Sequence, residues 1–218
     1  MPFQAVLFDL DGTLLDTLVD LAEAMNTVLA GLELPVHPVA NYRYYVGDGM
    51  RNLALRVLPA DRLDLADEVI DLMWHEYHAR RGATTQPYDG VPALLDALVA
   101  RELRLAVLSN KPDDLAKLVV GEKLGRWPFA VVLGARDGVP VKPDPSAARE
   151  ILAHLGLAPD QVLYVGDTAT DMHTAAAAGM PAVGAVWGFR TADELQAAGA
   201  RWLAEGPGDV LAALDAGS

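Results

Sequence analysis

The chain has 218 residues, no cysteine and a formal net charge of −13. The missing cysteines exclude disulfide bonds and thiolate metal sites, and the negative charge argues against general binding to nucleic acid or to an anionic membrane. A hydrophobic share of 52% predicts a substantial buried core.

The first ten residues lack the basic start and long apolar run of a signal peptide. No later stretch approaches the roughly 18 apolar residues of a membrane span. We therefore expect a soluble, cytoplasmic protein, either a monomer or a homodimer.

Short apolar runs recur along the chain. Near-continuous apolar character over so few residues is typical of strands buried on both faces, as in a parallel sheet. We expect strands at residues 5–8, 105–108, 130–133, 162–165 and 182–186, and helices at residues 92–100, 113–124, 146–155 and 168–178. This alternation predicts an α/β fold with a doubly wound, Rossmann-like, mostly parallel sheet.

One interval breaks the alternation. Residues 16–85 contain no convincing strand but two sets of apolar residues at helical spacing: Leu18, Leu21, Met25 and Leu29, then Leu65, Val69, Leu72 and Tyr77. We expect an inserted α-helical subdomain at residues 16–85, with its far border near residues 81–87. Residues 1–15 and 86–218 would form the α/β core.

Two aspartates, Asp9 and Asp11, directly follow the first predicted strand. Ligands of open α/β sheets bind beyond the carboxyl ends of the strands. Gly12 allows a tight turn there, whose backbone amides are free to approach an anion. The alternative is a simple turn after a strand.

A second acidic pair, Asp167 and Asp171, follows the strand predicted at residues 162–165. Both could be stabilising residues at a helix N-terminus. If the two strand ends converge, carboxylates roughly 4 Å apart repel by about 4 kcal/mol per pair at an effective dielectric of about 20. Such a cluster requires a cation or raised pKa values, and oxygen ligands favour Mg²⁺.

An anionic substrate would need donors and a positive charge nearby. Ser109 ends the second predicted strand, and Lys142 lies in a loop rich in proline. Each also has an ordinary structural explanation: Ser109 as a helix cap, and Lys142 as an exposed lysine.

Together these segments resemble the motifs of the haloacid dehalogenase superfamily, over essentially the whole chain. Residues 9–13 resemble the first motif, Ser109 the second, Lys142 the third, and Gly166 and Asp167 with Asp171 the fourth. The insertion resembles the helical cap of one branch of that superfamily.

The resemblance implies a Mg²⁺-dependent phosphomonoester hydrolase with an aspartyl-phosphate intermediate. Asp9 would be the nucleophile, and Asp11 would protonate the leaving oxygen and then deprotonate the hydrolytic water. It further implies phosphate binding by Gly12, Thr13, Ser109, Asn110 and Lys142, and metal binding by Asp9, the main-chain carbonyl of Asp11, Asp167 and Asp171.

Residues 42–52 are similar to the specificity segment of phosphoglycolate phosphatases. Arg43 and Arg51, beside the glycine turn at Gly49, could receive the carboxylate of 2-phosphoglycolate, or could simply form a solvated helix face. Pyrophosphate, a sugar phosphate or a nucleotide are the alternative substrates, and a non-catalytic binding protein is the alternative from another class. We expect a small anionic phosphorylated partner, with no nucleic acid and no membrane.

Overall fold

The computed structural model describes residues 3–80 and 83–217. A six-stranded sheet in the order β5-β4-β1-β6-β7-β8 forms its centre, and all of its strand pairings are parallel. The strands are β1 (Ala5–Phe8), β4 (Arg104–Pro112), β5 (Phe129–Ala135), β6 (Val162–Gly166), β7 (Ala182–Ala185) and β8 (Trp202–Ala204). The predicted doubly wound α/β fold is confirmed.

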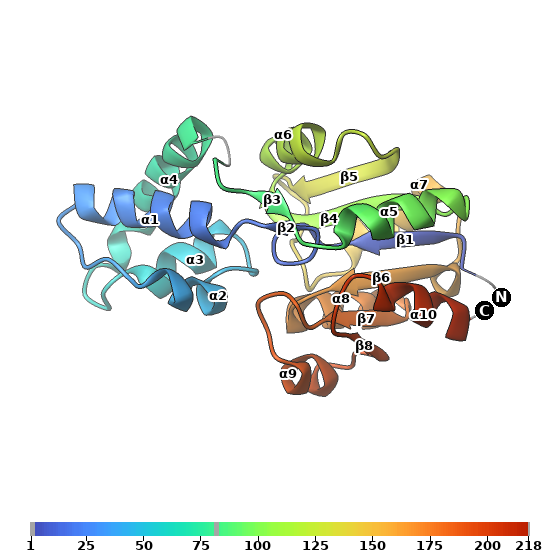
Figure 1. Ribbon diagram of the computed structural model, residues 1–218. Helices are drawn as coiled ribbons and strands as arrows, with labels where there is room; N and C mark the ends of the chain where they lie inside the picture. Colours follow the sequence, from blue (N-terminus) through green and yellow to red (C-terminus); the bar gives the residue numbers. More distant parts are fainter. Residues whose placement is uncertain (1–2, 81–82, 218) are drawn as a thin grey trace.

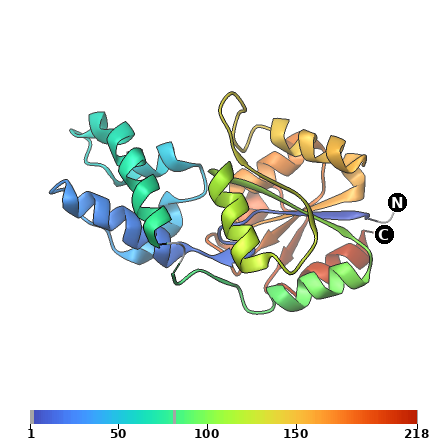
Figure 2. The same ribbon diagram turned by 90° about the horizontal axis from the view of Figure 1, so that it is seen from above.

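Helices cover both faces of this sheet (Figure 2). Because successive side chains of a strand point to opposite faces, Val6 and Phe8 lie in one hydrophobic cluster and Ala5 and Leu7 in another. The first face packs against α5 (Val91–Ala100), α6 (Asp113–Leu124) and α10 (Asp209–Ala216), and the second against α7 (Ser146–Leu155), α8 (Ala169–Ala178) and α9 (Ala192–Ala197). β1 is thus apolar and buried on both faces, as the sequence indicated.

Local sequence sets the ends of the helices that matter for the site. Thr168 caps α8: its hydroxyl accepts the amide of Asp171, and the carboxylate of Asp171 accepts the amide of Thr168. Gly179 ends the helix in the left-handed conformation, which glycine adopts without steric cost. The predicted strands and helices of the core overlap β1, β4 to β7 and α5 to α8, whereas β8, α9 and α10 were not predicted.

The helices α1 (Leu18–Gly31), α2 (Tyr42–Tyr45), α3 (Met50–Val57) and α4 (Ala66–Arg80) gather at one end of the molecule (Figure 1). Short 3₁₀ turns lie at Val39–Asn41, Leu63–Leu65 and Pro159–Gln161. The four helices share a hydrophobic cluster of their own, which Leu115 and Phe189 join from the sheet side. Leu72, one of the apolar residues at helical spacing, is 39% exposed, while its neighbour Met73 is fully buried.

The chain crosses between the two parts of the molecule at a small antiparallel pair, β2 (Leu15–Asp16) with β3 (Gln86–Pro87). Beside it, the buried carboxylate of Asp20 accepts the backbone amides and the hydroxyls of Thr84 and Thr85, at 2.6–3.1 Å. Although burial opposes it, hydrogen bonds from these threonines hold the pKa of Asp20 below its ordinary value. Asp20 therefore ties the outgoing helix α1 to the returning strand.

The predicted domain limits, 1–15 with 86–218 and 16–85, stay a prediction, and residues 81 and 82 of the far border lie outside the described residues. No helix within residues 3–80 or 83–217 has the length and apolar character that crossing a membrane requires. The cytoplasmic location and the monomeric or homodimeric state stay predictions as well.

Candidate active site

The site lies where the order of the sheet reverses. From β1 the strands proceed through β4 to β5 on one side and through β6 to β8 on the other. Ligands of open α/β folds bind at such a switch point, beyond the carboxyl ends of the strands. Asp9 follows β1, Ser109 lies near the end of β4, and Asp167 follows β6, so the predicted residues meet at this edge.

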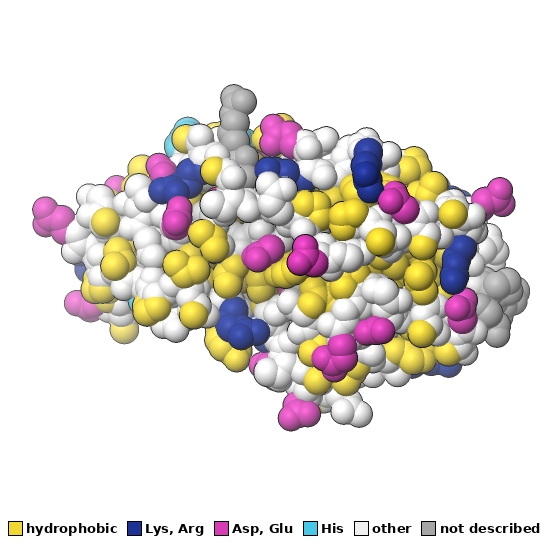
Figure 3. Space-filling view, viewed as in Figure 1, with side chains coloured by type: hydrophobic (Ala, Val, Ile, Leu, Met, Phe, Trp, Pro, Cys, Tyr) yellow, Lys and Arg dark blue, Asp and Glu magenta, His cyan; other side chains and the backbone are white. Residues whose placement is uncertain are grey.

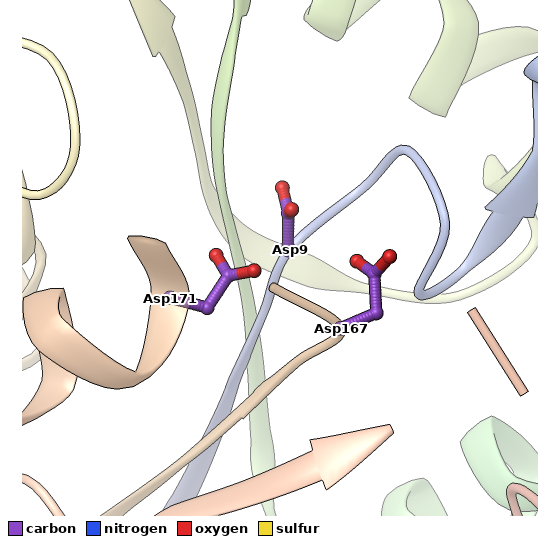
Figure 4. Close-up of side chains that lie close together, drawn as sticks. All are labelled: Asp9, Asp167 and Asp171. Atoms are coloured by element: carbon purple, nitrogen blue, oxygen red, sulfur yellow. The ribbon is translucent and has the colours of Figure 1, made fainter. Parts of the chain in front are cut away.

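Asp9, Asp167 and Asp171 form a compact, buried cluster (Figure 4). One carboxylate oxygen of each lies within 4.8 Å of the others. Among the described residues, no other group of three or more acidic or histidine side chains is placed to hold a metal ion. The strand ends do converge, which is the condition on which the argument from repulsion rested.

The cluster carries more negative than positive charge. Burial and the neighbouring Asp171 carboxylate raise the pKa of Asp9 well above its ordinary value, and raise the pKa of Asp167 to about 7. The ammonium of Lys142, 2.9 Å from Asp9 Oδ1 and 2.7 Å from Asp171 Oδ1, compensates only part of this repulsion. A divalent cation would supply the rest, and a donor set made only of oxygen fits a hard ion.

Hydrogen bonds fix the orientation of Asp167 and Asp171. The hydroxyl of Thr13 donates to Asp167 Oδ1 at 2.9 Å, and the amide of Phe189 donates to its Oδ2 at 2.9 Å. Thr168 donates its amide and its hydroxyl to Asp171 Oδ2, at 3.0 and 2.7 Å. The carboxylates are therefore preorganised by residues distant from them in sequence as well as by neighbours.

Gly12 was expected to bind phosphate, and that role stays a prediction. Its amide donates to the carbonyl of Leu15 at 2.9 Å. Gly12 has φ +90°, and a Cβ there would lie 2.3 Å from Asp167 Oδ2. Glycine is required for this backbone conformation and for the close approach of the Asp167 carboxylate.

Phosphate binding by Thr13 and Asn110 also stays a prediction, and in the structure their side chains have other hydrogen-bond partners. The hydroxyl of Thr13 donates its hydrogen bond to Asp167. The amide group of Asn110 donates to the carbonyls of Gly47 and Lys142, at 3.1 and 3.0 Å, and its Oδ1 accepts the amide of Lys142 at 2.9 Å. Both side chains hold other parts of the site in place, and Asn110 connects the sheet to the helical end.

Lys111 is a site residue that the sequence argument did not identify. Its Nζ donates to both carboxylate oxygens of Asp11, at 3.0 and 2.9 Å. Burial lowers the pKa of Lys111, but Asp11 and Tyr77 together outweigh this and hold the pKa above its ordinary value. The sequence signal for Lys111 was its position two residues after Ser109, at a strand end expected to lie beside Asp9 and Asp11.

A cavity of about 50 Å³ lies above these residues. One wall consists of residues from the sheet edge: Asp9, Asp11, Ser109, Asn110 and Lys111. The other comes from the helical end: Leu21, Val46, Gly47, Gly49, Met50 and Leu53. Asp9 and Asp11 therefore face a small, partly apolar space, with Ser109 beside them.

The structure brings Gly49 to this cavity but neither Arg43 nor Arg51. Arg43 Nε donates to the carbonyl of Phe189 at 2.9 Å, so this side chain connects α2 to the loop after β7. The Arg51 side chain is 68% exposed and pairs with Asp67 at 2.7 Å. Arg51 matches the alternative of a solvated helix face, because its side chain lies largely in solvent.

The molecular surface agrees with the overall charge. On the face shown in Figure 3, the side chains of Lys and Arg are scattered, with Asp and Glu between them. The described residues form no broad basic patch on this face, such as binding to a nucleic-acid backbone requires.

Comparison with known proteins identifies relatives along most of the chain. A family model for haloacid dehalogenase-like hydrolases matches residues 3–179. A phosphoglycolate phosphatase from Rhodospirillum rubrum is 40% identical over 195 residues, which cover 85% of this chain and 80% of the relative. One from Xanthomonas campestris is 35% identical over 193 residues, covering 88% and 86%. A solved structure of a candidate phosphoglycolate phosphatase from Lactobacillus delbrueckii subsp. bulgaricus has a TM-score of 0.89 at 26% identity, covering 98% and 99% of the two chains.

Proposed function

The chain belongs to the haloacid dehalogenase-like hydrolases and is a phosphatase, and we propose that it hydrolyses 2-phosphoglycolate to glycolate and phosphate through an aspartyl-phosphate on Asp9. The observation that carries the mechanism is the position of Asp9, which lies in the buried carboxylate cluster and also lines the cavity.

In the first step, a carboxylate oxygen of Asp9 attacks phosphorus and the bond to the ester oxygen breaks. Asp11, in the same cavity wall, gives its proton to the leaving oxygen. In the second step, Asp11 takes a proton from water, the water oxygen attacks phosphorus, and the bond to Asp9 breaks to release phosphate. Splitting the reaction in this way replaces one very slow displacement with two easier ones.

The phosphate group would be held by the hydroxyl of Ser109, which lines the cavity, and by the charge of Lys142 beside Asp9. Asp9, the main-chain carbonyl of Asp11, Asp167 and Asp171 would hold Mg²⁺. When bound, the ion supplies positive charge that lets an anionic ester approach an anionic nucleophile.

Two observations support a small substrate. The relatives from Rhodospirillum and Xanthomonas bear the name phosphoglycolate phosphatase. The cavity of about 50 Å³ has room for only a few water-sized groups, since one water needs roughly 10–15 Å³. A glycolate group suits this space, whereas a nucleoside or a hexose would require the helical end to move away from the sheet.

The test is kcat/KM with Mg²⁺ for 2-phosphoglycolate, pyrophosphate, sugar phosphates and nucleotides. We expect a preference for 2-phosphoglycolate of about a hundredfold or more, the discrimination that well-placed polar contacts achieve. A flat profile or another preferred ester would disprove the substrate but not the chemistry.

The chemistry has its own test. Asp9→Asn should abolish turnover of every ester without unfolding the protein, while Asp137→Asn, at an exposed position, should leave turnover unchanged. Turnover by Asp9→Asn at the wild-type rate would refute the nucleophile assignment, and an inactive wild-type protein would favour the non-catalytic alternative.

A further inference from the structure

Lys111 is a buried cation with no role in the chemistry described above. Only 4% of its side chain is exposed, and Asp11, its partner, is 16% exposed. Its two hydrogen bonds reach both oxygens of one carboxylate. A charge-assisted pair of this kind fixes where the carboxylate group lies.

Lys111 is itself held by a residue of the helical end. Its Nζ lies 4.7 Å from the centre of the Tyr77 ring, a cation–π distance. Tyr77 belongs to α4 and is 3% exposed. The contact thus joins the end of β4 to the helical end of the molecule, and it exists only while the two lie against each other.

Asp11 has no comparable support elsewhere. Among the described residues, Lys111 makes the only side-chain hydrogen bonds to the Asp11 carboxylate. A proton donor must lie within hydrogen-bond reach of the leaving oxygen, and small displacements of a catalytic group reduce rates strongly. The orientation of this carboxylate therefore depends on Lys111.

We propose that Lys111 is a positioning residue that aims the carboxylate of Asp11 at the leaving oxygen, and that the Tyr77 ring holds Lys111 in place when the helical end closes on the sheet. This inference rests on the proposed function, because it takes Asp11 as the acid. It adds the contact between Lys111 and Tyr77, through which closure of the helical end also aligns Asp11.

The experiment compares leaving groups of similar size. Acetyl phosphate releases acetate, which needs no proton to leave, whereas 2-phosphoglycolate and ethyl phosphate release alkoxides that do. We expect Lys111→Met to lower kcat/KM, which reports only the steps up to release of the leaving group, for both alkyl esters by about ten- to a hundredfold, within the range of general acid catalysis. For acetyl phosphate, kcat/KM should change by less than about threefold.

Matched variants separate this role from a general effect on the fold. Lys117→Met, at an exposed lysine paired with Asp113, should behave as wild type. Tyr77→Phe, which keeps the ring, should retain activity, and Tyr77→Leu should show the selective loss in weaker form. If Lys111→Met does not fold, as judged by circular dichroism, Lys111→Gln takes its place.

A double-mutant cycle tests whether Lys111 acts through Asp11. In an Asp11→Asn background, Lys111→Met should lower kcat for 2-phosphoglycolate by less than about threefold, because residues that act as one unit are not additive. Independent, multiplied losses would contradict the proposal.

The remaining outcomes are also decisive. A loss confined to 2-phosphoglycolate, with ethyl phosphate unaffected, would show that Lys111 binds the substrate carboxylate. Equal losses on all three substrates would show a structural role, and either result overturns the proposal. If Asp11→Asn itself shows no dependence on the leaving group, the acid role in the proposed function has failed. If Asp11→Asn shows that dependence and Lys111→Met does not, only the present inference has failed.

Discussion

At the scale of single residues, the site depends on positions where no other side chain fits. Gly12 combines φ +90° with a Cβ position 2.3 Å from Asp167 Oδ2 and 2.8 Å from the ring of Phe189. Gly138 has a similar φ of +75° but no neighbouring atom within 4 Å of its Cβ position. Comparing the same substitution at the two glycines therefore separates the cost of backbone strain from the cost of a steric clash at Cβ.

We predict that Gly12→Ala lowers the free energy of unfolding by about 1–3 kcal/mol more than Gly138→Ala does. Both substitutions impose the left-handed backbone on alanine, but only the first displaces the Asp167 carboxylate. Urea denaturation of the two variants measures the difference. Urea denaturation with and without Mg²⁺ should also show that Gly12→Ala weakens Mg²⁺ binding. Equal losses of stability in the two variants would indicate that Asp167 can move at little cost.

The pKa of Asp167 makes a second prediction at this scale. A carboxyl whose pKa is about 7 in the folded protein and about 3.9 when unfolded binds more protons in the folded state between these values. The free energy of unfolding then falls as pH rises through this window. In EDTA, wild type should therefore lose stability relative to Asp167→Asn between about pH 4 and pH 7.

Thermal unfolding of both proteins across that pH range, without metal, gives the measurement. The comparison removes contributions that the two proteins share, including that of Asp20. A difference in Tm that stays constant from about pH 4 to pH 7 would mean that the Asp167 carboxylate is not destabilised by its neighbours.

At the scale of elements, the crossing between the two parts is held by Asp20. Its carboxylate satisfies two backbone amides and two hydroxyls of Thr84 and Thr85. Removing the acceptor leaves buried donors without a partner, which costs roughly 1–3 kcal/mol. This interaction fixes where α1 leaves the sheet edge relative to β3.

We predict that Asp20→Ala loses about that free energy of unfolding, while Asp71→Ala, at an exposed position of α4, loses almost none. Because the folded pKa of Asp20 is lowered, its contribution is present above its unfolded pKa and is lost as the pH falls through the folded value. Denaturation at neutral and at acid pH tests both points: the gap between wild type and Asp20→Ala should narrow in acid, and a gap that widens would contradict the assignment.

At the scale of the whole molecule, bound metal should act as a stabilising ligand. Three buried carboxylates share one buried lysine, so a divalent cation should bind the folded chain far better than the unfolded one. At a hundred times Kd, such a ligand adds about 2.7 kcal/mol. For a chain of this size, that corresponds to roughly 5–10 °C in Tm.

We therefore predict that Mg²⁺ raises Tm by this amount, that EDTA reverses the rise, and that Asp171→Asn reduces it while Asp137→Asn does not. Scanning calorimetry with and without metal checks the shift. A Tm independent of Mg²⁺ in wild type, at concentrations that support turnover, would count against the carboxylate cluster as the metal site.

Much of the site could be predicted because its signals are local. Asp9 and Asp11 follow an apolar strand, as do Asp167 and Asp171, and parallel strands bring their carboxyl ends to one edge. Local patterns likewise predicted the helices that begin at Asp113 and Ser146. Weak patterns failed at the C-terminal end, where β8 is three residues long.

The remaining features depend on side-chain directions that only packing establishes. Arg51 faces solvent, and Arg43 donates a hydrogen bond to a backbone carbonyl. The side chain of Asn110 forms hydrogen bonds with Gly47 and Lys142. Lys111 meets Asp11 across 100 positions of sequence. Residue spacing reports which side chains leave the same strand end or helix face, but contacts between separate elements arise from how those elements pack, and no local pattern records that arrangement.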